Sequence, residues 1–408
     1  MKTILIISGG TEAIPGILRA KAMGLHVVVS DQNCDAPGFT YSDDRILAST
    51  YDVVATVAAA RDYHRTVRPI NGVICMAADV PLTVASVAAA LGLPGLVLET
   101  ARLAADKLAM KQCFIKAAIP VPWFNSLNSA EELRVMMAER DHALVVKPVD
   151  SRGARGVLRI DNKTNPVWTF EHAQANSPTG RVMVEEYLAG PQISTESVMI
   201  DGRGFTSGFI DRNYEFLDQF SPYMIENGGE QPTVLTSEQQ LQVTTVVEQG
   251  ALAMGIENGI AKGDMVLTEN GPKVIEIAAR LSGGWMSSDQ IPLGTGVDII
   301  AAAVQIALGE QPSEEVLRPQ FHQGVAIRYF FPPPGKVTAI INVKQVEHLP
   351  WVHRLGLFVS PGEIIHKTTN HTKRAGFVIT TGKDRNEAVQ RAQQVVSIID
   401  IQTEVVNG

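Results

Sequence analysis

Cysteine is scarce in this sequence. The 408 residues contain only three, Cys34, Cys75 and Cys113, and these lie far apart. They form neither a C-x-x-C pair nor the spacing of zinc ligands. An odd and sparse count fits a reducing compartment, so we expect free thiols that are buried or incidental.

Long apolar runs and an excess of positive charge are also missing. No stretch of about 18 apolar residues occurs, so we expect no membrane span. The apolar run Ile4–Ile7 is too short for a signal peptide and ends in the turn Ser8-Gly9-Gly10, which favours a cytoplasmic location. The net charge of −8 gives no electrostatic footprint for nucleic acid or an anionic membrane. A local basic pocket for a phosphate group remains possible.

Strand and helix patterns alternate over the first hundred residues. Apolar strands are expected at Ile4–Ile7, His26–Ser30 and Gly72–Met76, separated by helical patterns. This order indicates βαβ units and a parallel sheet, with ligands expected at the carboxyl ends of its strands. Further along, Leu103–Ile119 is predicted to be one helix. The length favours two or three domains rather than one.

A lysine and a glycine-rich turn follow one another in the middle of the chain. Lys147 closes the apolar strand Leu144–Pro148, where it is either a snorkelling surface residue or a phosphate clamp. The next segment, Ser151–Gly156, contains two glycines and two arginines. It is either a plain hairpin turn or a nest of N–H groups that cradles a polyphosphate.

Two further segments carry carboxylates. Glu185-Glu186-Tyr187-Leu188 ends a strand, and it is either a solvated strand end or a hinge whose backbone contacts adenine. In the stretch 264–280, Asn270-Gly271 predicts a β-hairpin, and antiparallel pairing about this turn brings Asp264 and Glu276 together. Two converging carboxylates repel unless they are protonated or bridged by a cation, and Mg²⁺ prefers such oxygen ligands.

The order of these segments resembles the ATP-grasp superfamily, in its biotin-carboxylase-like and carboxylate–amine ligase branch, including L-amino-acid ligases. The order is a strand lysine, a glycine-rich turn, a Glu-Glu-Tyr-Leu hinge, a carboxylate hairpin and Arg-x-x-Gly-Gly. The resemblance implies an α/β ATP-grasp fold. It places a Rossmann-like domain at 1–100, the ATP-grasp body at 101–322 with a lid at about 124–187, and a strand-rich C-terminal domain at 323–408.

The resemblance also assigns roles to individual residues. Catalytic roles fall to Arg280, which would stabilise an acyl phosphate, and to Lys147. ATP contacts are implied for Lys107, Lys147, Ser151, Arg152, Gly153, Gly156, Glu185, Glu186, Tyr187, Leu188 and Gln192. Asp264 and Glu276 would bind Mg²⁺. The substrate would meet Arg212, Tyr223, Glu226, Arg280, Ser282, Gly283, Gly284 and Trp285.

Two positions depart from the family pattern. Gln192 stands where the family often carries a glutamate that binds ribose, although an amide can still bond a hydroxyl. Ala278 stands where the family often carries an asparagine as a third metal ligand. One metal ion is therefore expected to be held differently, and Glu269 is a weaker candidate for that role.

The resemblance implies a ligase that uses ATP and Mg²⁺. The γ-phosphoryl group of ATP would pass to a substrate carboxylate, and an amine, expected to come from an amino acid, would attack the acyl phosphate. The partners would be small molecules, with no nucleic acid or membrane, and the branch suggests a homodimer. An ATP-dependent carboxylase or a purine-pathway ligase would share the ATP residues. A non-catalytic ATP-binding regulatory protein is the alternative of another class.

Overall fold

The structure is a computed structural model that describes residues 1–405. The chain divides into two compact units. The first unit comprises Met1–Val121, Ile193–Phe209 and Leu235–Phe321, and the second comprises Pro122–Gln192, Ile210–Val234 and the segment from His322 onward. The fold is an α/β architecture with a parallel N-terminal sheet and antiparallel sheets after it, as expected. The three predicted domain boundaries stay a prediction.

A four-stranded parallel sheet opens the first unit. Its order is β3-β2-β1-β4, and its strands are β1 (Thr3–Ile7), β2 (His26–Asp31), β3 (Asp44–Leu47) and β4 (Gly72–Cys75). The helices around it are α1 (Ile14–Ala22), α2 (Val53–Thr66), α3 (Pro81–Leu91), α4 (Leu98–Ala105) and α10 (Ile299–Ala307). The parallel sheet predicted from the alternating pattern is therefore confirmed.

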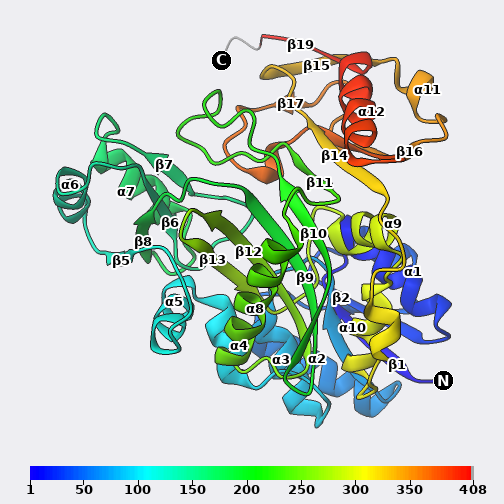
Figure 1. The fold of residues 1–408 in the computed structure, drawn as a ribbon. Helices are drawn as coiled ribbons and strands as arrows, with labels where there is room; N and C mark the ends of the chain where they lie inside the picture. Colours follow the sequence, from blue (N-terminus) through cyan, green and yellow to red (C-terminus); the bar gives the residue numbers. More distant parts are fainter. Residues whose placement is uncertain (406–408) are drawn as a thin grey trace. The chain divides into compact units, whose positions relative to one another are not determined.

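The two faces of this sheet are buried by different helices (Figure 1). Ile4 and Ile6 of β1 point into a cluster formed with α1 and α10. Leu5 and Ile7 point the other way, into a cluster that includes side chains of α2 and α3. Successive side chains of a strand alternate between faces, and a strand buried on both faces needs an unbroken apolar run. The run Ile4–Ile7 has this pattern.

The rest of the first unit is built around an antiparallel hairpin. It contains β12 (Gly259–Thr268), β13 (Gly271–Ala278), α5 (Lys107–Lys116), α8 (Ser237–Ala253), α9 (Ile291–Thr295), most of β9 (Gln192–Ile200) and most of β10 (Arg203–Arg212). The sheet order here is β13-β12-β9-β10. Apolar residues of α5, α8, β12 and β13 form one shared core.

The predicted helix Leu103–Ile119 is wrong in one respect. The structure has two helices, α4 and α5, which meet at Asp106. Asp106 has an extended backbone, and its carboxylate accepts a hydrogen bond from the Ala109 N–H at 2.8 Å. Aspartate favours this N-cap position because it satisfies an N–H group that the first turn leaves without a helical partner.

The second unit contains two groups of strands. The lid has the order β5-β8-β6-β7, with β5 (Phe124–Leu127), α6 (Ala130–Ala138), β6 (Leu144–Pro148), β7 (Leu158–Ile160), α7 (Pro166–Ala175) and β8 (Val182–Glu186). The remainder has β11 (Gly228–Gln231), β14 (Gly324–Phe330), β15 (Gly335–Ile341), α11 (Val343–Val346), β16 (Val352–Leu357), β17 (Ile364–Ile365), β18 (Gly376–Gly382), α12 (Arg385–Ile398) and β19 (Asp400–Glu404).

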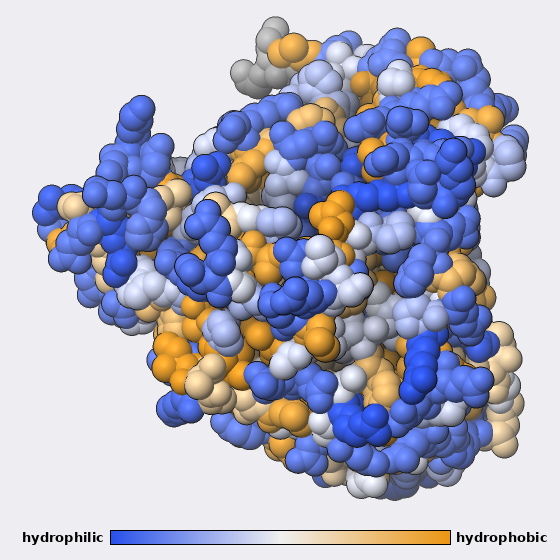
Figure 2. All heavy atoms as spheres, in the orientation of Figure 1, coloured by the Kyte–Doolittle hydropathy of each residue, from blue (hydrophilic) through white to orange (hydrophobic). Residues whose placement is uncertain are grey.

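The surface mixes both kinds of side chain. Figure 2 shows hydrophilic residues over most of the face drawn, with hydrophobic residues interspersed among them. Over residues 1–405, no helix combines the length and the apolar character needed to cross a membrane.

Candidate active site

The β12–β13 hairpin of the first unit places two carboxylates opposite one another. Asp264 and Glu276 are paired in the antiparallel register, as the Asn270-Gly271 turn predicted. Each side chain is 18% exposed. The Ser194 hydroxyl donates to Asp264 Oδ1 at 2.7 Å, and the Lys262 ammonium donates to Asp264 Oδ2. Lys107 Nζ lies 3.2 Å from Glu276 Oε1. Each carboxylate is thus neutralised by a lysine.

This pair offers a small set of hard oxygen ligands. Within residues 1–405, no group of three or more His, Cys, Asp or Glu side chains could hold a metal ion. Glu269 lies in the hairpin turn beyond Thr268, five residues and about 17 Å along the chain from Asp264. This position separates Glu269 from the carboxylate pair and disfavours its suggested role as a further ligand. Two carboxylates suit Mg²⁺, which usually keeps water and substrate phosphate oxygens as its other ligands.

Arg280 follows the hairpin and is surrounded by acidic groups. Its Nε lies 3.5 Å from Asp79 Oδ1, and its Nη1 donates to the Leu281 carbonyl at 3.0 Å. Burial disfavours the charged guanidinium, but the nearby carboxylates of Asp79, Glu276 and Asp264 outweigh it and raise the pKa of Arg280 above its ordinary value. This side chain therefore stays cationic beside the carboxylate pair.

The turn after Arg280 already binds two carboxylates of the chain. The Ser282 N–H donates to Glu196 Oε1 at 3.1 Å, and the Gly284 N–H donates to Glu12 Oε2 at 2.8 Å. A Cβ on Gly283 would lie only 2.8 Å from that Glu12 oxygen, so a larger residue there would push the Glu12 side chain away. The substrate contacts predicted for Ser282, Gly283 and Gly284 stay predictions, and a substrate anion at the Gly284 N–H would have to displace Glu12.

Glu196 is buried beneath this turn. Its Oε1 also accepts the Ser287 hydroxyl at 2.9 Å. Complete desolvation raises the pKa of Glu196, although the hydrogen bonds from Ser282 and Ser287 oppose this effect. Glu196 therefore supports the shape of the turn from inside the unit.

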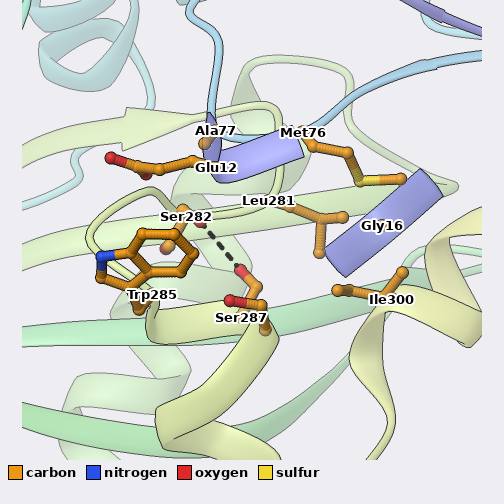
Figure 3. A pocket seen from close by; sticks show the side chains of 10 residues that line it. Glu12, Gly16, Met76, Ala77, Leu281, Ser282, Trp285, Ser287 and Ile300 are labelled. Carbon is orange, nitrogen blue, oxygen red and sulfur yellow. Dashed lines mark hydrogen bonds between the residues drawn. The ribbon is translucent and has the colours of Figure 1, made fainter. Parts of the chain in front are cut away.

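A small pocket lies against the same turn (Figure 3). Trp285, which is 5% exposed and has a left-handed backbone with φ 61°, forms part of its wall together with Leu281. The substrate contact predicted for Trp285 stays a prediction. The other lining residues are Glu12, Gly16, Met76, Ala77, Ser282, Ser287, Ser288 and Ile300.

In the second unit, Lys147 and Glu185 form a buried ion pair. Lys147 Nζ lies 2.5 Å from Glu185 Oε1, and the side chains are 5% and 3% exposed. They project from the neighbouring antiparallel strands β6 and β8. A lysine at the end of a strand could have snorkelled into solvent, but this one is held inside the lid by a carboxylate.

The hinge backbone is partly used by the lid itself. The Glu186 N–H donates to the Trp123 carbonyl at 2.9 Å, and the Tyr187 N–H donates to the Ala143 carbonyl at 3.0 Å. These two N–H groups therefore do not serve as donors to adenine in this arrangement. The adenine contacts predicted for Glu185 and Leu188, and the ribose contact of Gln192, stay predictions.

The glycine-rich segment forms a tight turn. Gly153 and Gly156 have φ values of 63° and 72°, which favour glycine. A Cβ on Gly156 would also meet Pro148 Cγ at 2.9 Å, so packing requires glycine as well. Arg155 Nη1 donates to the Arg152 carbonyl, and the Gly153 carbonyl accepts the His371 N–H at 3.1 Å. The Gly153 carbonyl thus ties the loop to the second unit's C-terminal region, and the ATP contact of Ser151 stays a prediction.

The predicted substrate residues of the second unit are not all together. Arg212 and Glu226 form an ion pair with one another, rather than facing two ends of a ligand separately. Tyr223 packs edge-on against His172 and Trp168 of α7, and it bridges to Leu158 of β7. Core packing of the lid therefore accounts for Tyr223.

Two acidic residues near the first-unit cluster were missed by the sequence analysis, and the contact of a third, Glu196, was not predicted. Glu12 and Asp79 follow β1 and β4, at the carboxyl ends of parallel strands, where ligand contacts are expected. That position was the available signal. Glu196 lies on the same strand face as Gln192, but its contact with Ser282 spans 86 residues, and no local pattern could reveal it.

Comparisons with known proteins agree with this geometry. The model of the ATP-grasp domain matches residues 104–284, and the model of L-amino acid ligase C-terminal domain 2 matches residues 328–404. An uncharacterized protein of Sinorhizobium fredii is 27% identical over 386 residues, which cover 91% of this chain and 72% of that protein. Dapdiamide A synthase of Enterobacter agglomerans is 24% identical over 287 residues, which cover 67% of this chain and 65% of the synthase, just under two thirds.

A solved structure extends the likeness to the whole chain. The crystal structure of an L-amino acid ligase from Bacillus licheniformis matches with a TM-score of 0.84 at 22% identity, covering 99% of both chains. At that identity the match shows a shared fold. The two family models place this chain in the ATP-grasp superfamily, as an L-amino-acid-ligase-like member of its carboxylate–amine ligase family.

Proposed function

We propose that this enzyme couples the carboxylate of one amino acid to the amine of a second, by way of an acyl phosphate. A carboxylate oxygen of the first substrate attacks the γ-phosphorus of ATP, and ADP leaves. The amine nitrogen of the second substrate then attacks the acyl carbon, and phosphate leaves with one of the original carboxylate oxygens. The atoms balance without a covalent enzyme intermediate.

One observation carries this proposal. Asp264 and Glu276 converge with Lys107, Lys262 and Arg280 in one partly buried cluster of the first unit. Phosphoryl transfer needs little covalent chemistry from a protein, and its catalysis depends on positioning and on neutralising the charge of the phosphoryl oxygens. A cluster that combines two hard carboxylates with three fixed cations meets that need.

The donor set fits Mg²⁺, with Asp264 and Glu276 as its protein ligands. When bound, the ion would supply Lewis-acid stabilisation of the phosphoryl oxygens. Arg280 would bind the acyl phosphate, since its guanidinium is buried and cationic. Lys107 would contact the ATP phosphates, and we assign the same role to Lys147 in the second unit. The homodimer suggested by the resemblance stays a prediction.

Isotope transfer tests the proposal directly. We would incubate the enzyme with ATP, Mg²⁺ and pooled amino acids, one of them labelled with ¹⁸O in its carboxylate. The expected result is amino-acid-dependent ADP release, a dipeptide found by mass spectrometry, and one ¹⁸O atom in the released phosphate. Turnover that depends on bicarbonate instead would indicate a carboxylase. ATP binding without turnover, with any acceptor, would indicate a regulatory protein.

A single variant tests the site. Glu276→Ala removes one of the two carboxylates and should abolish Mg²⁺-dependent turnover. The matched control is Glu269→Ala, because Glu269 lies in the exposed hairpin turn, away from the pair. Intact Mg²⁺-dependent turnover in Glu276→Ala would mean that the metal assignment is wrong.

A further inference from the structure

Lys262 occupies an unexpected place beside the carboxylate pair. It lies on β12 two residues before Asp264, so both side chains project from the same face of the strand. Its partner across the ladder is Ala278 of β13. Directly opposed side chains in an antiparallel pair have Cβ atoms about 4.5–5.5 Å apart. The methyl group of Ala278 leaves room there for the long side chain of Lys262.

The lysine is held at the pair by its charge. Its ammonium donates to Asp264 Oδ2, and its side chain is only 13% exposed. Lys107, also 13% exposed, stands in the same relation to Glu276. Each of the two carboxylates is therefore paired with one fixed ammonium group.

A second divalent cation would find no further protein ligand at this site and would be repelled by its positive charge. Ala278 has no donor atom, and the part of the chain that the structure describes contains no group of three or more Asp, Glu, His or Cys side chains that could hold a metal ion. An ammonium group carries three donors and no acceptor, so Lys262 repels a metal ion rather than binding it.

We propose that this site takes a single divalent cation and that the Lys262 ammonium supplies the second positive charge to the transferred phosphoryl group. On metal binding, Lys262 would release Asp264 to the ion and turn its N–H groups toward the phosphoryl oxygens. Its role toward the phosphoryl group rests on the proposed function, whereas the number of bound cations does not. Lys262 would thus be a further catalytic residue, opposite the position where a third ligand is missing.

Counting bound Mn²⁺ tests the number of cations. We would titrate the wild-type enzyme with Mn²⁺ in the presence of the non-hydrolysable nucleotide AMP-PNP and follow bound Mn²⁺ by electron paramagnetic resonance. One Mn²⁺ per chain is expected, and two per chain would overturn the proposal. The count uses no amino acid, so it stands even if amino-acid ligation fails.

A double variant asks whether a second ion can be restored. Lys262→Ala combined with Ala278→Asn removes the repelling cation and adds an oxygen ligand. This protein should bind two Mn²⁺ per chain, while Lys262→Ala alone should still bind one. A count of one in the double variant would contradict the idea that Lys262 and Ala278 together set the number.

Lys262→Met separates a catalytic lysine from a merely structural one. It should bind Mn²⁺ about tenfold more tightly, because Asp264 loses its competing cation. It should also lose turnover by about 100-fold, the usual effect of removing one group that stabilises developing charge. Lys262→Arg should retain turnover within about tenfold, and exposed Lys116→Met is the control. Unchanged Mn²⁺ affinity and unchanged turnover in Lys262→Met would overturn the proposal.

Discussion

Replacing Lys147 with methionine should destabilise the second unit as well as weaken nucleotide binding. The substitution leaves Glu185, which is 3% exposed, as a buried carboxylate without its cation. Removing one partner of a buried ion pair costs about 3–5 kcal/mol, mainly because the remaining charge stays desolvated. That loss is large against the 5–15 kcal/mol typical of folded proteins. Urea unfolding followed by tryptophan fluorescence would measure it, since Trp123 and Trp168 belong to the lid region.

The double variant Lys147→Met with Glu185→Leu separates the two effects. Replacing a whole buried pair with apolar side chains is often neutral or stabilising, so most of the lost unfolding free energy should return. Nucleotide affinity, measured by calorimetry, should stay low, because the lysine that we propose binds phosphate is still missing. A single Lys147→Met variant as stable as wild type would refute the structural role. Recovered nucleotide affinity in the double variant would refute the ATP role.

Local patterns were sufficient to predict the parallel strands and the hairpin that holds the carboxylate pair. The alternating apolar runs predicted β1, β2 and β4, and the Asn270-Gly271 turn predicted the hairpin with its carboxylate pair. These features depend on side-chain periodicity and turn geometry, which act over a few residues. Asp106 shows the limit of such patterns. It ends one helix and its carboxylate caps the next, where the sequence pattern predicted a single helix.

Tertiary pairing could not be predicted in the same way. Glu12 meets Gly284 across 272 residues, and Lys147 meets Glu185 across 38. The resemblance gave Lys147 a role in ATP binding and gave Glu185 a role through its backbone, but neither suggested that the two side chains bond one another. A charged residue inside an apolar pattern signals a partner, since burying an isolated charge is costly, but the pattern does not say which residue the partner is.

Two further predictions follow from burial in the first unit. Iodoacetamide should alkylate exposed Cys34 well before Cys75, because burial raises the pKa of the Cys75 thiol to about 12; equal rates by peptide mass spectrometry would contradict this. The second concerns Glu196, whose pKa is raised by desolvation. Below about pH 4.3, the ordinary value for Glu, folded and unfolded states both hold the proton, so the contribution to stability is fully present. As pH rises toward the folded-state pKa, the unfolded chain releases its proton first. The free energy of unfolding of wild type then falls by up to about 1.4 kcal/mol per pH unit. Glu196→Gln keeps a carbonyl acceptor for Ser282 and Ser287 but cannot ionise. Its free energy of unfolding, measured with urea, should therefore rise relative to that of wild type between pH 4 and pH 7. A difference that stays constant with pH would mean that the carboxyl group ionises as easily in the folded protein as in the unfolded chain.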